Sequence, residues 1–69
     1  MFYTLYLYHK NAYETIDFGI YYTIEEGLLA IKAKYPSWTE LHKTYLGDDV
    51  LITGLIDEKL WTAVFDAFM

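Results

Sequence analysis

The segment that most constrains the fold is FYTLYLYH, residues 2–9. Its tyrosines and leucines favour a β-strand, in which successive side chains point to opposite faces of a sheet. One face of this strand would carry Tyr3, Leu5 and Leu7, and the other would carry Phe2, Thr4, Tyr6 and Tyr8. An antiparallel sheet with a single packed layer normally has one polar face. Because both faces are largely apolar or aromatic, the sequence raises the question of what covers the second one.

The length of the chain limits how it can be stabilised. Its 69 residues predict one domain over residues 1–69. A core of that size rarely supplies more than about 3–5 kcal/mol of net stability, so small domains often add a disulfide, a metal or a second chain. The sequence has no cysteine, which excludes disulfides and thiolate metal sites. With 55% hydrophobic and 20% aromatic residues, dense packing or association is what remains.

A hairpin is predicted at the start of the chain. Residues 14–22, ETIDFGIYY, alternate apolar and polar side chains and favour a strand that follows a four-residue connection at 10–13. In the register set by that connection, the apolar partners are Tyr3 with Ile20, Leu5 with Phe18, and Leu7 with Ile16. A shift by one residue would interrupt this apolar face.

A helix is predicted next. Thr23 and Glu26 form a capping-box signature, and Pro36 marks the end of the helix. Apolar side chains recur at helical spacing between these limits, at Ile24, Leu28, Ile31 and Tyr35.

The second half of the chain predicts two more strands and a second helix. Residues 38–46 and 50–55 favour strands, with a turn at 47–49 between them. Asp57 can cap a final helix whose apolar stripe would be Leu60, Trp61, Val64, Phe65 and Phe68. The order ββαββα predicts an α+β fold, a four-stranded antiparallel sheet with two helices packed on one face. The alternative order βαββαβ requires another strand at the end of the chain, where the pattern is typical of a helix.

Candidate binding residues lie on the face of the predicted sheet that the helices leave uncovered. They are Phe2, Tyr6, Tyr8, Asp17 and Tyr21. Tyrosine and phenylalanine are enriched in the centres of interfaces, and exposed aromatic patches on small proteins often mark interaction sites. The simpler interpretation is that tyrosines merely decorate an exposed sheet, since their hydroxyl groups tolerate water. We interpret this face as a protein-binding surface.

No catalytic or metal-binding motif is recognisable. His9 and His42 are the only histidines, and no HxH or HxxxH spacing occurs. Ser37, the only serine, lies outside a GxSxG motif, and glycine-rich phosphate loops are absent. We therefore expect no enzymatic activity, no cofactor and no metal. The alternative is a small hydrolase in which His9, His42 and a carboxylate act together.

The charge balance indicates the class of partner. Ten carboxylates face five lysines, with no arginine, and the formal net charge is −5. This disfavours direct nucleic-acid binding, which depends on neutralising phosphates, and favours a basic protein partner. We expect a small acidic binding module, for example an inhibitor encoded by a virus or mobile element that mimics nucleic acid and covers a basic surface of a host nucleic-acid-processing protein. The alternative is a structural homo-oligomer, such as a homodimer, packed through the aromatic face.

The start of the sequence bears on localisation. It lacks the basic residues and apolar run of a signal peptide, and no segment approaches 18 uncharged apolar residues. These features predict a cytoplasmic protein without a membrane partner.

Overall fold

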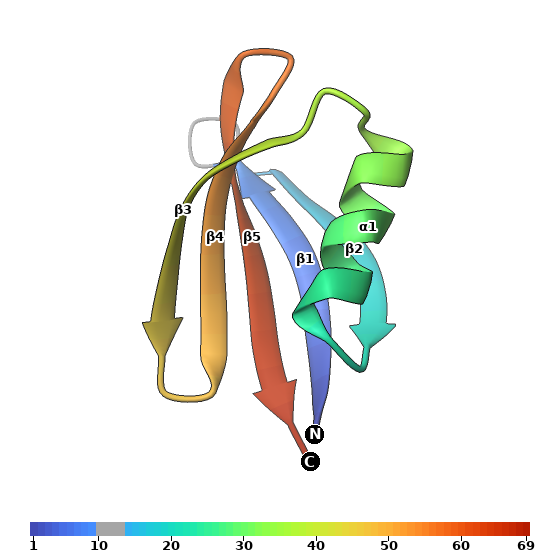
Figure 1. Ribbon diagram of the computed structural model, residues 1–69, viewed down its shortest axis with the longest axis vertical. Coiled ribbons are helices and arrows are strands. Elements are labelled where there is room, and N and C mark those ends of the chain that lie inside the picture. Colours follow the sequence, from blue (N-terminus) through green and yellow to red (C-terminus); the bar gives the residue numbers. More distant parts are fainter. Residues whose placement is uncertain (10–13) are drawn as a thin grey trace.

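Residues 1–9 and 14–69, which the computed structural model describes, form five β-strands and one α-helix. The elements are β1 (Phe2–His9), β2 (Glu14–Tyr21), α1 (Ile24–Lys34), β3 (Thr39–Leu46), β4 (Asp49–Ile56) and β5 (Lys59–Phe68). The strands form one antiparallel sheet in the order β2-β1-β5-β4-β3, and α1 packs on one face of it (Figure 1). The predicted connection at residues 10–13 lies outside the described residues.

The predicted ββαββα fold is wrong in its last element. Residues 59–68 form β5, which lies in the middle of the sheet between β1 and β4. This strand has apolar side chains on both faces, so the spacing that resembles a helical stripe is also satisfied by an extended chain. Its β-branched and aromatic residues, such as Trp61, Val64 and Phe65, favour a strand. Residues 1–9 and 14–69 therefore form a five-stranded sheet and a single helix.

The predicted helix cap at Asp57 is a hairpin turn. Asp57 and Glu58 have φ angles of 50° and 68°. Two consecutive residues with positive φ are typical of the type I′ turn, whose twist matches that of the flanking strands. Ile56 then pairs with Lys59, and β4 leads directly into β5.

A β-bulge in β2 changes the predicted register of the first hairpin. Leu7 pairs with Ile16, as predicted, but Leu5 pairs with Gly19, so that Phe18 is the extra residue. Gly19 has a φ of 96°, and its N–H donates to Asp17 Oδ1 at 3.2 Å. A positive-φ glycine is typical of bulges. Beyond the bulge, every side chain of β2 lies on the face opposite to the predicted one.

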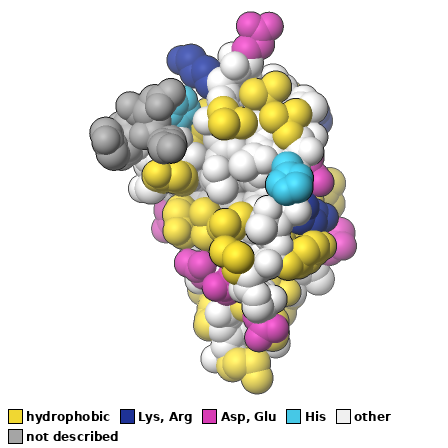
Figure 2. All heavy atoms as spheres, turned by 90° about the vertical axis from the view of Figure 1, so that its left-hand side faces the viewer, with side chains coloured by type: hydrophobic (Ala, Val, Ile, Leu, Met, Phe, Trp, Pro, Cys, Tyr) yellow, Lys and Arg dark blue, Asp and Glu magenta, His cyan; other side chains and the backbone are white. Residues whose placement is uncertain are grey.

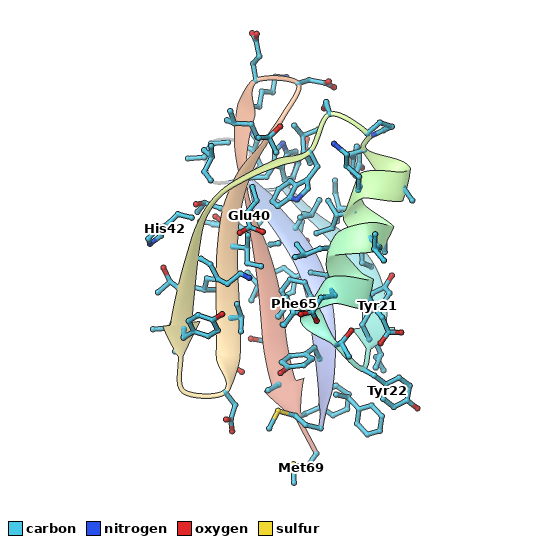
Figure 3. The ribbon with its side chains drawn as sticks, in the orientation of Figure 1. Tyr21, Tyr22, Glu40, His42, Phe65 and Met69 are labelled. Carbon is cyan, nitrogen blue, oxygen red and sulfur yellow. The ribbon has the colours of Figure 1, made fainter. Side chains whose placement is uncertain are left out.

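The hydrophobic core lies between α1 and the face of the sheet that we call the covered face. This face includes Leu5 and Leu7 of β1, Val50 and Ile52 of β4, and Trp61, Ala63 and Phe65 of β5, all buried. Ile31 of α1 and Trp38, which follows the helix, complete the buried cluster. Phe65 lies beneath α1 (Figure 3).

Two glycines allow aromatic rings to approach the backbone on the covered face. Gly27 of α1 lies against the Phe65 ring, and Gly54 of β4 lies against the Trp38 ring. In both cases a Cβ atom would occupy space that the ring already fills. The core therefore depends on the absence of a side chain at these two positions.

The predicted helix N-cap at Thr23 is confirmed, and Glu26 takes part in it through its backbone N–H and its carboxylate. The Glu26 N–H donates to Thr23 Oγ1 at 3.1 Å, and the Thr23 hydroxyl donates to Glu26 Oε1 at 3.1 Å. Thr23 has the extended backbone of a helix N-cap, with φ of −133° and ψ of 157°. At the other end, the Tyr35 N–H donates to the Ile31 carbonyl at 2.7 Å.

We expect Thr23→Ala to lower the free energy of unfolding by about 1 kcal/mol, because one helical N–H loses its acceptor. Thr23→Ser retains a hydroxyl and should lose less than half of that amount. The check is urea denaturation followed by far-ultraviolet circular dichroism. Equal stability of the alanine and serine variants would contradict a capping role.

Candidate protein-binding face

All five strands contribute to one continuous surface on the face of the sheet opposite to α1. We call this surface the open face. Its residues include Phe2, Thr4, Tyr6, Tyr8, Thr15, Asp17, Ile20, His42, Thr44, Leu51, Thr53, Leu55, Leu60, Thr62, Val64, Asp66 and Phe68. They share this face because side chains alternate along each strand and directly paired residues point the same way. Among the described residues, no helix or strand packs over it.

An apolar row crosses the middle of the open face. Tyr6 of β1 pairs with Asp17 of β2 on one side and with Val64 of β5 on the other. Val64 pairs in turn with Leu51 of β4, and Leu51 pairs with Thr44 of β3. The next row is polar: Thr15, Tyr8, Thr62, Thr53 and His42 follow one another across the five strands.

Large apolar side chains on the open face remain accessible to solvent. Ile20 is 62% exposed, Leu60 is 57% exposed, and Tyr8 is 37% exposed. Val64 is only 9% exposed, although no helix or strand of the described residues covers it, because its neighbours in the same row screen it. Some apolar side chains of the open face are thus shielded from solvent before any partner binds, while others remain exposed. Burial of the exposed ones favours association.

An aromatic cluster extends the open face at the end of the molecule where the chain termini meet. The Phe2 ring lies 4.8 Å from the ring of Tyr22 and 5.6 Å from that of Phe68, measured between centroids. Tyr22 is 66% exposed and points away from the body of the protein (Figure 3). Rigid, exposed aromatic rings bury large areas on binding at little entropic cost.

The β3 edge adds further exposed apolar surface. Leu41, Tyr45 and Leu46 of this strand are all more than half exposed. Figure 2, which looks onto this edge, shows hydrophobic side chains spread over it among scattered carboxylates. A bulge beside Glu40 interrupts the ladder between β3 and β4, and bulges of this kind hinder the addition of another strand.

The charges of the open face have one sign. Asp17 and Asp66 are exposed carboxylates on strands β2 and β5. The lysines of the described residues lie elsewhere: Lys32 and Lys34 on α1, Lys43 and Lys59 at covered-face positions of β3 and β5. Among the described residues, the open face therefore combines aromatic and apolar side chains with carboxylates and no lysine.

The structure brings together four of the five predicted binding residues. Phe2, Tyr6, Tyr8 and Asp17 share the open face. Tyr21 does not, because the bulge turns it to the covered face, where it packs against the core and donates a hydrogen bond to the Phe18 carbonyl at 3.1 Å. Ile20 takes the outward position that had been predicted for Tyr21.

Several residues of the open face had not been predicted to lie there. Val64, Asp66 and Phe68 belong to β5, which had been predicted as a helix, and Leu51 belongs to the second hairpin, whose register the sequence leaves undetermined. No alternation of apolar and polar residues marks the β5 segment, because Ala63, Val64 and Phe65 are consecutive, and its β-branched and aromatic residues only favour a strand over a helix.

The two histidines lie far apart in the sheet. His9 is on β1, with its ring 4.8 Å from the ring of Trp61, whereas His42 is on the β3 edge and points away from the sheet (Figure 3). Strands β5 and β4 separate them, which corresponds to roughly 14 Å between strand axes. Within the described part of the chain, no group of three or more His, Cys, Asp or Glu residues could hold a metal ion. The hydrolase alternative thus has no geometric support.

Asp49 has a structural role. Its Oδ1 accepts a hydrogen bond from the Ala67 N–H at 2.7 Å, which extends the pairing of β4 with β5 beyond the last backbone pair.

No family model, no curated protein and no solved structure matches the chain. Among residues 1–9 and 14–69, no helix is long and apolar enough to cross a membrane.

Proposed function

We propose that this protein is a non-enzymatic binding module that docks its open face on a basic surface of another protein. The observation that carries the proposal is an uncovered sheet face on which aromatic and apolar side chains surround carboxylates without any lysine among the described residues. Interface centres are typically rich in tyrosine and phenylalanine, and unmatched charges on such a face require a partner of opposite sign.

The carboxylates favour a foreign partner over a second copy of this chain. If two open faces packed together, Asp66 would be removed from water opposite a surface that offers no lysine in its described part. A desolvated carboxylate without a cation costs several kcal/mol. Arginine or lysine side chains of a partner would instead pair with Asp17 and Asp66.

Tyr6, in the apolar row of the open face, can bind the same cations through its aromatic ring. Tyr6 lies directly beside Asp17, so a guanidinium group that contacts the carboxylate can also lie over the tyrosine ring. Cation–π contacts contribute about 0.5–1 kcal/mol at exposed sites, and more when water is excluded. This combination selects arginine-rich surfaces more strongly than uniformly apolar ones.

Basic surfaces of this kind are typical of proteins that bind nucleic acid. A net charge of −5 on 69 residues lets the module compete with phosphate for such a surface. An inhibitor encoded by a virus or mobile element, directed at a nucleic-acid-processing protein of its host, is the biological role that fits this chemistry.

We expect the double variant Asp17→Asn, Asp66→Asn to bind the basic partner about tenfold more weakly at low salt, because two charge pairs are lost. Asparagine retains an oxygen acceptor, so the hydrogen bond to the Gly19 N–H can persist. The measurement is quantitative mass spectrometry of proteins recovered from a bacterial lysate with tagged wild-type and variant protein, at low and high salt.

The matched control is Asp48→Asn, Glu58→Gln, which removes two exposed carboxylates from turns outside the open face. The partner should be depleted by the open-face variant, retained by the control, and released by high salt. Recovery that is indifferent to salt, or that falls equally with both variants, would refute docking through the carboxylates of this face.

The homodimer alternative is tested by the mass of the wild-type protein in light scattering at tens of micromolar. We expect a monomer. A dimer that the Tyr6→Lys substitution dissociates would instead assign the open face to self-association.

A further inference from the structure

A groove lies on the other side of the molecule, between α1 and the start of β3. It has a volume of about 420 Å³. The residues that line it are Glu25, Leu28, Leu29, Lys32, Trp38 and Glu40. The volume lies within the range of about 300–1,000 Å³ that is typical of ligand sites.

The walls of the groove are apolar and fixed in place. Trp38 is 6% exposed, and its ring is held between the groove and the backbone of Gly54. The Lys32 Nζ donates to the Trp38 carbonyl at 3.1 Å, which ties α1 to the segment that follows it. Leu29, by contrast, is 70% exposed on α1. The groove is therefore preformed and presents an apolar side chain that the protein itself does not cover.

Two carboxylates stand on opposite sides of this groove. Glu25 belongs to the first turn of α1, and Glu40 belongs to β3, from which it points toward the middle of the molecule (Figure 3). Within the described residues, no lysine forms an ion pair with either of them, and Lys32 donates to a carbonyl instead. A ligand that enters between them meets apolar side chains, these two carboxylates and the ammonium group of Lys32, which is engaged with the Trp38 carbonyl.

We propose that this groove binds a short protein segment in which a bulky apolar side chain adjoins a lysine or arginine. The apolar side chain would cover Leu29 and the Trp38 edge, and the cation would reach Glu25 or Glu40. Such a segment would match the groove in shape and charge. Its binding is independent of the proposed function, because the groove and the open face lie on opposite sides of the sheet.

The test is a nuclear magnetic resonance titration of the ¹⁵N-labelled full chain with two capped pentapeptides, Ala-Lys-Leu-Lys-Ala and Ala-Glu-Leu-Glu-Ala. We expect the lysine peptide to give saturable shifts of the Trp38 indole N–H and of the Leu29 amide, with a millimolar dissociation constant. The glutamate peptide should give none, because like charges repel it.

Three variants locate the binding. Leu29→Ser should abolish the saturable shifts without unfolding the protein, since Leu29 is largely exposed. The pair Glu25→Gln, Glu40→Gln should weaken binding about fivefold. The control pair Glu14→Gln, Glu58→Gln removes the same charge outside the groove and should change the dissociation constant less than about twofold.

Three outcomes would overturn the proposal: no saturable shift of the Trp38 indole, an equal response to both peptides, or equal weakening by both glutamine pairs. Shifts confined to Tyr6 and Val64 would also overturn it, and would locate cation binding on the open face instead. Failure of the groove and failure of the open face are thus distinguishable in one titration.

Discussion

Gly54→Ala is expected to lower the free energy of unfolding by about 2 kcal/mol. A Cβ built on Gly54 would lie 2.6 Å from Trp38 Cζ3 and 2.7 Å from the Thr39 carbonyl oxygen. Alanine is intrinsically better than glycine in a strand by about 0.5–1 kcal/mol, but overpacking a core costs about 1–3 kcal/mol, and backbone cannot rotate away as a side chain can. For a domain with about 3–5 kcal/mol of net stability, the loss is a large fraction of the total.

Urea denaturation followed by tryptophan fluorescence measures this effect, and the midpoint of thermal unfolding should fall by roughly 10–15 °C. Trp38→Phe removes the outer ring atoms that meet the new methyl group. In that background we expect Gly54→Ala to cost about 1 kcal/mol less than in the wild type. Gly54→Ala that is neutral or stabilising in the wild-type background would contradict the close approach of Trp38 to β4.

Gly27→Ala is the second substitution with a large expected effect, and two opposing terms decide its sign. Alanine improves helix propensity by about 0.8–1.0 kcal/mol. The added Cβ would lie 2.9 Å from Phe65 Cζ and 3.1 Å from Leu5 Cδ2, both of them fully buried residues. Because neither can move into solvent, overpacking exceeds the gain in propensity, and we expect a net loss of about 1–2 kcal/mol in the free energy of unfolding.

The two terms are separated by companion variants measured in the same denaturation experiment. Ala33→Gly, at an exposed position of α1, should cost about 1 kcal/mol and reports propensity alone. In a Phe65→Leu background, which lacks the ring atoms, the cost of Gly27→Ala should fall by at least about 1 kcal/mol. A stabilising Gly27→Ala in the wild type would show that α1 does not pack closely on β5.

Part of the open face was readable from the sequence. Phe2, Tyr6 and Tyr8 alternate in a strand that is apolar on both faces, and Asp17 follows from pairing at the start of the hairpin. Tyr21 was misplaced because one extra residue reverses every later side chain, and the signal for a bulge was a single glycine. Strand periodicity predicts faces only as far as the first irregularity.

The central strand shows a second limit of periodicity. Residues 60–68 carry apolar side chains on both faces, so helical and extended conformations both find an apolar stripe in them. Local sequence could not choose between the two, because the choice depends on the strands that flank β5 on either side. Once β1 and β4 pair with it, every backbone group of an apolar segment in the middle of the sheet finds a partner.

The sequence by itself determined β1, β2 before α1, β3 after α1, and the helix with its cap at Thr23. It also determined the acidic charge and the absence of cysteine. These are local properties: side-chain alternation, capping chemistry and composition. Only the tertiary structure decided the fifth strand, the bulge at Gly19 and the Asp66 carboxylate on the open face. They depend on which distant segments become neighbours, and contact between distant segments is what local periodicity does not encode.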